Sequence, residues 1–139
     1  MIEKEKKPIK EDRLLNITKE SISQYLLEVF AAIKAGKYQI SARNKNLELF
    51  MNYIFTEQDA KEVLLSLTVQ DFSEAVYNEH SDYAEEILYI FGKEVSLVSR
   101  YSGKEEVVAL YIKFNKLDSH YVIVISFHKQ KYPMKYMFR

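Results

Sequence analysis

The residue types best suited to chemistry lie close together near the end of the sequence. Tyr111 and Lys113 alternate with apolar residues in one segment, and Ser126 and His128 do so in the next. Because alternate residues of a strand point to the same side, these side chains would share one polar face if the two segments pair. Lysine and arginine neutralise phosphates and tyrosine rings stack on unpaired bases, so such a face is suited to single-stranded RNA. A basic, aromatic tail follows directly and consists of Lys129, Lys131, Tyr132, Lys135, Tyr136 and Arg139.

A plainer interpretation stays open at this point. Tyrosine and lysine on the outer face of a sheet are usually solvated, and His128 could simply end a strand. The other histidines predict no site: His80 lies in an acidic stretch whose spacing matches no metal-ligand motif, and His120 lies in a polar connection. The sequence also has no phosphate-binding glycine loop and no nucleophile elbow, so we expect neither a metal nor a cofactor.

The elements that must position this face begin with three apolar stripes at helical spacing. Ser21 followed by Gln24 predicts a capping box at the start of the first helix, and Gly36 predicts its C-terminal cap. Thr56 followed by Asp59 predicts the start of the third helix. The stripes consist of Ile22, Tyr25, Leu26, Val29, Phe30 and Ile33, then Leu47, Phe50, Met51 and Ile54, then Ala60, Val63, Leu64 and Leu67.

From residue 86 onward the sequence is rich in β-branched and aromatic residues, which favour strands. Gly92-Lys93 predicts a tight hairpin turn between strands at 86–91 and 94–101. Two more strands are predicted at 107–114 and 121–127. Their predicted core-facing residues are Leu110, Ile112 and Phe114 on the first and Ile123, Ile125 and Phe127 on the second, which leaves Val122 and Val124 opposite.

Smaller elements complete the prediction. Residues 38–40 predict a short strand, and residues 68–77 predict a short helix or turn. The tail predicts an edge strand, because Pro133 is tolerated at a sheet edge but not at its centre. Helices first and strands afterwards predict an α+β fold, with an antiparallel sheet and the N-terminal helices packed on one face.

The length of 139 residues fits one domain, which we place at 16–139 after a charged, flexible extension at 1–15. The absence of cysteine excludes disulfides and thiolate chemistry. The N-terminus alternates charges without an apolar core, so it does not resemble a secretory signal, and no apolar run is long enough to span a membrane. We therefore expect a cytoplasmic protein.

The net charge of zero conceals opposite local charges. Residues 56–91 carry one Lys or Arg against nine Asp or Glu, whereas residues 107–139 carry six against one. Because the local field attracts a polyanion, a neutral total does not exclude RNA binding. An uneven but merely solvated surface is the alternative explanation.

Several short motifs, in this order along residues 22–136, resemble the MqsR family of bacterial toxins. They are Lys34-Ala-Gly-Lys37, Arg43, Leu65-Ser-Leu-Thr-Val-Gln-Asp71-Phe72, Glu86–Tyr89, Leu110-Tyr-Ile-Lys-Phe114, Val124-Ile-Ser-Phe-His128 and Tyr132-Pro-Met-Lys-Tyr136. The resemblance implies a RelE-like microbial ribonuclease fold, cleavage of mRNA, and neutralisation by a cognate antitoxin protein.

The resemblance also implies roles for individual residues. The family's strand tyrosine falls on Tyr111, and the basic residue that closes the last long strand, a lysine in some relatives, falls on His128. A family glutamine falls on Glu86. Glu74 replaces a lysine of some relatives and so reverses the charge, which makes Glu74 a doubtful catalytic candidate and leaves cleavage itself open.

These residues suggest metal-independent acid–base cleavage of RNA. His128 could act as base or acid, because imidazole titrates nearest neutral pH, and Glu86 could be a base or orient His128. Lys113, with Lys129 or Lys131, could stabilise the phosphorane-like transition state. We therefore assign His128, Tyr111, Lys113 and Glu86 as catalytic candidates and Lys129, Lys131, Tyr132 and Lys135 as RNA-binding candidates.

Two alternatives remain. The first is a noncatalytic protein- or RNA-binding member of the same scaffold, such as a phage-encoded or anti-defence factor, which the charge change at Glu74 favours. The second is a metal-dependent nuclease that uses the acidic loop around His80. Sensitivity to EDTA would separate a metal-dependent nuclease from a metal-independent one.

Overall fold

The computed structural model describes residues 17–78, 82, 86–117 and 119–139. Its elements, in chain order, are α2 (Lys19–Lys34), β1 (Tyr38–Ile40), α3 (Asn44–Asn52), β2 (Tyr53–Ile54), α4 (Glu57–Leu65), the 3₁₀ turn η2 (Val69–Asp71), β3 (Phe72–Tyr77), β4 (Ile87–Ser99), β5 (Glu105–Lys116) and β6 (Val122–Lys129). The extension predicted at 1–15 and His80 lie outside the described residues.

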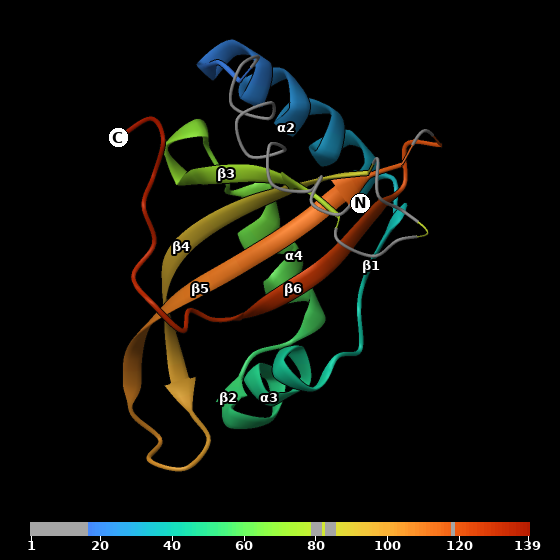
Figure 1. Cartoon of the computed structure of the whole chain (residues 1–139). Helices are drawn as coiled ribbons and strands as arrows, with labels where there is room; N and C mark the ends of the chain where they lie inside the picture. Colours follow the sequence, from blue (N-terminus) through green and yellow to red (C-terminus); the bar gives the residue numbers. More distant parts are fainter. Residues whose placement is uncertain (1–16, 79–81, 83–85, 118) are drawn as a thin grey trace.

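All six strands belong to one sheet, in the order β1-β6-β5-β4-β2, and β3 also pairs with β4 on the edge that carries β2 (Figure 1). β1 is parallel to β6, and every other pair is antiparallel. The predicted α+β class is therefore confirmed, with one parallel pair added to the expected antiparallel sheet.

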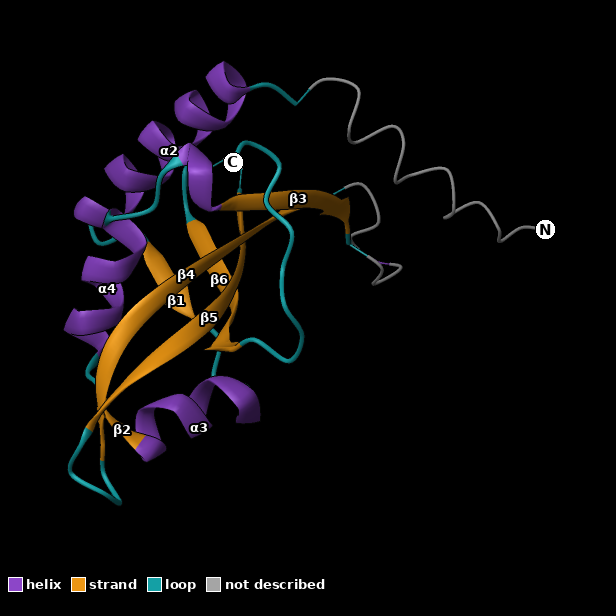
Figure 2. Ribbon diagram, turned by 90° about the vertical axis from the view of Figure 1, so that its left-hand side faces the viewer, coloured by secondary structure: helices purple, strands orange, loops and turns teal. Residues whose placement is uncertain are grey.

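Helices α2 and α4 cover one face of the sheet, as predicted, while the C-terminal residues cross the opposite face (Figure 2). The core between helices and sheet includes Ile22, Val29, Ile33, Leu64, Phe91, Leu110, Ile112 and Phe114. Helix α3 instead lies at one end of the sheet, against β6. Among the residues that the structure describes, the tail is the segment that crosses the face of the sheet opposite α2 and α4.

The helix ends follow side-chain capping. Thr18, not Ser21, caps α2: the amide of Ser21 donates to Thr18 Oγ1 at 3.0 Å, and the amide of Thr18 donates to Ser21 Oγ at 2.9 Å. The predicted box of Ser21 with Gln24 was therefore wrong by one turn. Gly36 ends the helix at a positive φ of 77°, and Thr56 caps α4 with Asp59, both as predicted.

The predicted apolar stripe at Leu47, Phe50, Met51 and Ile54 was right only at Phe50, which packs against the core. The other three side chains are exposed, whereas Asn46 and Leu49 are buried. A buried asparagine outweighs apolar periodicity here, because its side chain bonds to the backbone of β6, as described below.

The predicted hairpin turn at Gly92-Lys93 was also wrong, because β4 runs through both residues without interruption and Gly92 pairs with Tyr111 of β5. A β-carbon at Gly92 would collide with the hydroxyl of Tyr136 and would lie 2.8 Å from the sulfur of Met134. Gly92 therefore marks the place where the tail approaches the middle of β4 closely. Such a close approach is a common reason for glycine inside a strand.

Two further segments differ from the prediction. Residues 69–71 form the expected turn, but Phe72–Tyr77 form a strand, β3. Residues 130–139 contain no strand and cross the face of the sheet opposite α2 and α4 as an irregular chain. No helix among the described residues is both long and apolar enough to cross a membrane.

Candidate active site

A cleft of about 610 Å³ lies on the face of the sheet opposite α2 and α4, between β5, β6 and the C-terminal tail. Its lining includes all four side chains of the predicted polar face. The full lining consists of Arg43, Lys45, Ser73, Glu74, Ile90, Tyr111, Lys113, Ser126, His128, Lys131, Tyr132, Pro133, Met134 and Lys135. The prediction that Tyr111, Lys113, Ser126 and His128 share one face is confirmed.

Strand pairing brings these four side chains together. Tyr111 pairs with His128 and Lys113 with Ser126 across β5 and β6. The rings of Tyr111 and His128 are stacked, with centroids 5.3 Å apart and planes 13° from parallel. The imidazole therefore lies nearly parallel to the neighbouring phenol ring.

A β-bulge at Ile125 is what turns His128 toward the cleft. Phe114 pairs with Val124 and Lys113 with Ser126, so Ile125 is an extra residue in β6. Before the bulge Val122 and Val124 face the core, and after it Phe127 does. The predicted core positions Ile123 and Ile125 were therefore wrong, because strict alternation does not continue through a bulge.

The side chain of Asn46 holds this bulge. Its Nδ2 donates to the carbonyl of Ile125 at 3.0 Å and to the carbonyl of Ser41 at 2.8 Å, and its Oδ1 accepts the amide of Phe127 at 2.8 Å. Asn46 is 1% exposed, so its bonds give partners to the backbone groups of Ile125 and Phe127, at and after the bulge, and to the carbonyl of Ser41. One amide of α3 thus sets the direction of Ser126 and His128.

The contacts of His128 favour a neutral ring, and its Nε2 makes no hydrogen bond with any residue that the structure describes. Nδ1 lies 2.8 Å from the carbonyl oxygen of Lys129, and because a carbonyl only accepts, Nδ1 carries the proton. Burial lowers the pKa of His128 below its usual value, and the charges of Lys45, Arg43 and Lys113 lower it further, against the opposing effect of the Lys129 bond. At neutral pH the Nε2 lone pair is therefore available as a base.

Tyr111 is shifted in the opposite sense. Burial, followed by the carboxylate of Glu74, raises the pKa of Tyr111 above its usual value, and Arg43 offsets part of this rise. The phenol consequently keeps its proton at neutral pH and can donate a hydrogen bond beside the imidazole.

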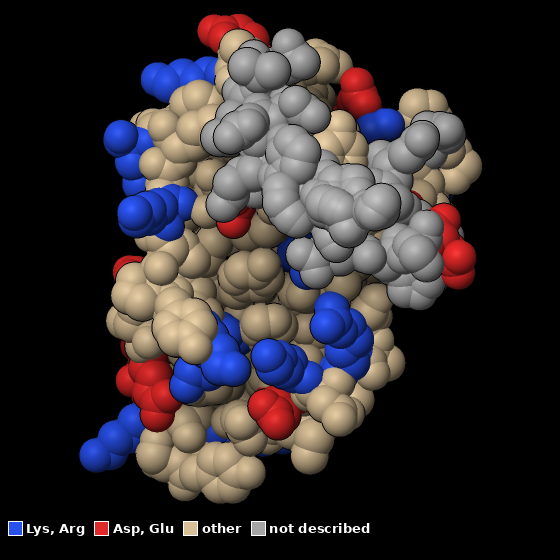
Figure 3. Space-filling model, viewed as in Figure 1, with Lys and Arg blue, Asp and Glu red and all other residues tan. Residues whose placement is uncertain are grey.

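Positive charge gathers around this pair of rings. Arg43 and Lys45 reach the cleft from the start of α3, Lys113 from β5, and Lys131 and Lys135 from the tail. Figure 3 shows lysine and arginine side chains clustered on the same side of the molecule that Figure 1 views. Arg43 and Lys45 were not predicted as site residues from the sequence. They lie beside His128 because the side chain of Asn46 in α3 is hydrogen-bonded to the backbone of β6.

The tail forms one wall of the cleft and is anchored along its length. Ser73 Oγ donates to the carbonyl of Lys135 at 2.5 Å, and the amide of Met137 donates to Phe72 at 3.1 Å. Arg139 donates to the carbonyl of Gln70 at 2.9 Å. These anchors keep Lys131, Tyr132 and Lys135 at the rim, where the sequence predicted RNA-binding groups.

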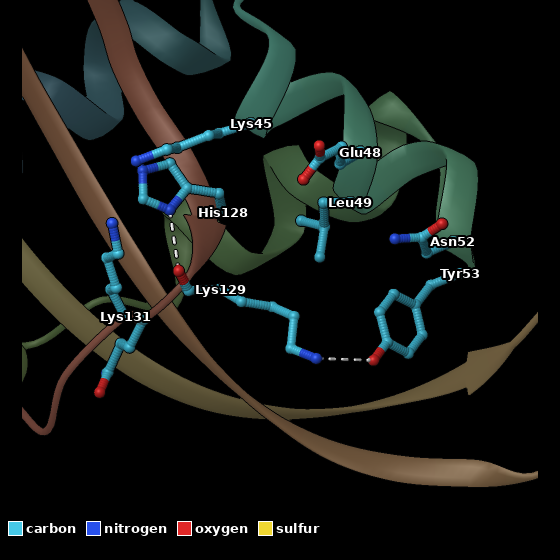
Figure 4. Close-up of a pocket in the computed structure, with 9 residues that line it drawn as sticks. Lys45, Glu48, Leu49, Asn52, Tyr53, His128, Lys129 and Lys131 are labelled. Atoms are coloured by element: carbon cyan, nitrogen blue, oxygen red, sulfur yellow. Dashed lines mark hydrogen bonds between the residues drawn. The ribbon is translucent and has the colours of Figure 1, made fainter.

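Two predicted residues lie elsewhere. Glu86 is outside the cleft, directly before β4, where its Oε1 accepts the side-chain amide of Asn78 at 3.0 Å. The carboxylate in the cleft belongs to Glu74 instead. Lys129 points into a separate pocket of about 250 Å³, called the side pocket below, which shares Lys45, His128 and Lys131 with the cleft (Figure 4).

The described residues contain no group of three histidine, aspartate or glutamate side chains placed to hold a metal ion. No protein-family model matches the chain, and no curated protein is significantly similar to it in sequence.

Proposed function

We propose that this protein is a toxin-like endoribonuclease that cleaves single-stranded mRNA without a metal ion, as its resemblance to MqsR-type toxins implies. The observation that carries the proposal is a neutral histidine with an unprotonated Nε2, stacked on a protonated tyrosine and surrounded by cationic side chains in one cleft. These are the groups that metal-independent cleavage of a phosphodiester requires.

The proposed reaction is a transfer within the RNA. His128 Nε2 takes the proton of a 2′-hydroxyl, the 2′ oxygen bonds to the adjacent phosphorus, and the bond to the 5′ oxygen breaks. Lys113 and Arg43 balance the growing charge on the phosphate oxygens, and Tyr111 gives its proton to the leaving 5′ oxygen. The proton on His128 then returns to the tyrosine, and the products carry a 2′,3′-cyclic phosphate and a 5′-hydroxyl.

Cleavage of RNA by the purified protein in excess EDTA is the direct test. We expect fragments that end in a 2′,3′-cyclic phosphate, and no cleavage of the same oligonucleotide made with 2′-O-methyl ribose, because that substrate lacks the nucleophile. Cleavage that stops in EDTA would contradict the proposal and favour the metal-dependent alternative.

A noncatalytic RNA-binding protein is the second candidate, and Glu74 favours it. The carboxylate of Glu74 lines the cleft and repels phosphate. Members of the MqsR family that carry lysine at this position have the opposite charge there. Retention of intact RNA by the purified protein, without fragments, is the outcome that supports this candidate over the nuclease.

The proposed antitoxin partner is supported by an open edge of the sheet. On β4, pairing with β3 ends at Phe91 and pairing with β2 begins at Val98, so within the described part of the chain residues 92–97 pair with β5 alone. A groove of about 400 Å³ along this edge includes Asp59 and Glu62, which favours a basic strand of a partner protein. The test is to express the protein in bacteria and measure growth. We expect growth to stop, and to resume when the antitoxin partner is expressed together with the protein.

The pH dependence of cleavage should report the cations around His128. A base acts when deprotonated, so the rate rises with pH through the lowered pKa of His128 and is level above it. Lys45→Gln removes one of the charges that lower this pKa, so we expect the rising limb of kcat/KM to move to higher pH. Lys34→Gln on the opposite face serves as the control. An unmoved limb in Lys45→Gln would exclude His128 as the group that titrates.

A further inference from the structure

The side pocket opens next to His128 and has walls from two elements. Lys45, Glu48, Leu49 and Asn52 line it from α3, at the spacing that places residues on one helix face. Lys129 lines the opposite wall (Figure 4). At about 250 Å³ it is smaller than typical ligand pockets of about 300–1,000 Å³, a size suited to one planar ring.

The base of this pocket is apolar and rigid. Leu49 is 2% exposed and Tyr53 5% exposed, so both belong to the core as well as to the pocket. Lys129 lies over the ring of Tyr53, 5.8 Å from its centroid, and donates to its hydroxyl at 3.4 Å. The same hydroxyl donates to Glu106 at 2.8 Å. The ammonium of Lys129 is therefore already engaged and held in place.

Glu48 is different, because the carboxylate makes no hydrogen bond or ion pair with any residue that the structure describes. Figure 4 shows Glu48 and Asn52 directed toward the pocket, on either side of Leu49. A carboxylate only accepts hydrogen bonds. The Oδ1 of Asn52 accepts the hydroxyl of Tyr101 at 3.4 Å, so the Nδ2 of Asn52 is the group that can donate to a ligand. The pocket thus presents one strong acceptor, the carboxylate of Glu48, and one donor, the Nδ2 of Asn52, above an apolar floor.

We propose that the side pocket binds one nucleobase next to the phosphate held at His128, and that Glu48 selects bases with an exocyclic amino group over uracil. The inference rests on the proposed function to the extent that RNA occupies the main cleft. Cytosine offers its N4 amino group to Glu48 and its N3 and O2 acceptors to Asn52. Uracil in the same orientation places its O4 carbonyl oxygen against the carboxylate of Glu48. Both groups only accept hydrogen bonds, so they repel each other.

Cytosine and uracil give a clean comparison, because both are single rings that differ at the position facing Glu48. We would measure the affinity of fluorescent 2′-O-methyl pentamers of cytidine and uridine, which cannot be cleaved, by anisotropy. We expect the wild-type protein to bind the cytidine pentamer roughly tenfold more tightly. Glu48→Gln should bring the ratio close to one, since an amide accepts and donates equally. Glu20→Gln, an exposed position on α2, should leave the ratio unchanged.

Equal affinity of the wild-type protein for the two pentamers, or no binding of either, would overturn the base-pocket inference. An unchanged ratio in Glu48→Gln would do so as well. Because the pentamers test binding alone, a cytidine preference without any RNA cleavage in EDTA would overturn the nuclease proposal and leave the pocket assignment standing. Cleavage without any base preference would do the reverse.

Discussion

Replacing His128 by alanine is expected to slow RNA cleavage by roughly 10²–10⁴-fold, the usual contribution of a general base. The variant loses the Nε2 that takes the 2′-hydroxyl proton, while the cations of the cleft remain. RNA affinity should therefore change little, and the loss should appear in kcat rather than KM. Single-turnover cleavage of a labelled oligonucleotide, together with anisotropy for binding, measures the two quantities separately.

A matched control comes from His120, which is exposed and lies in the connection between β5 and β6. Its φ of 63° favours asparagine as the replacement, so His120→Asn removes an imidazole without straining the backbone. That variant should keep full activity. If His128→Ala cleaves RNA at the wild-type rate while remaining folded, the catalytic role given to His128 is wrong.

Replacing Asn46 by alanine should lower the free energy of unfolding by about 2–4 kcal/mol, because buried backbone groups of Ser41, Ile125 and Phe127 lose their partner. Urea denaturation measures this loss, and Asn44→Ala, at an exposed position two residues earlier on α3, is the control. In the fraction that remains folded, cleavage should also fall, since the bulge that directs His128 is no longer held.

Asn46→Asp separates the two halves of the amide. The aspartate keeps an acceptor for the amide of Phe127 but turns a second oxygen toward the carbonyls of Ser41 and Ile125. Its effect should equal or exceed that of alanine, because a buried charge then faces two carbonyls. Full stability in either variant would mean that Asn46 does not hold the bulge.

The sequence was sufficient to predict elements that depend on local patterns. The stripe from Ile22 to Ile33 identified α2, the pair of Thr56 and Asp59 identified the start of α4, and alternation around Leu110 identified β5 and its core face. It also brought Tyr111 and His128 to one face. These predictions hold because capping and periodicity act within a few residues.

The remaining features depend on contacts between distant residues. Gly92 was predicted to form a turn, because the residue that requires a glycine there, Tyr136, is distant in the sequence. A β-carbon at position 92 would collide with the hydroxyl of Tyr136. The apolar stripe of α3 pointed the wrong way because Asn46 binds β6, nearly eighty residues later. Glu74 lines the cleft, and Glu86 does not, because Phe72–Tyr77 form the strand β3. The sequence of residues 68–77 does not by itself indicate a strand. Pairing geometry of this kind cannot be read from local patterns.

The bulge at Ile125 also bears on how this strand can change in length. Val124 faces the core and Ser126 faces the cleft, so a chain that lacks the residue between them would pair with β5 regularly and keep both sides unchanged. A relative one residue shorter in β6 can therefore carry the same cleft, provided that its gap is aligned at Ile125. A gap aligned several residues away would exchange cleft and core side chains between the gap and Ile125, and would obscure the shared site in the comparison.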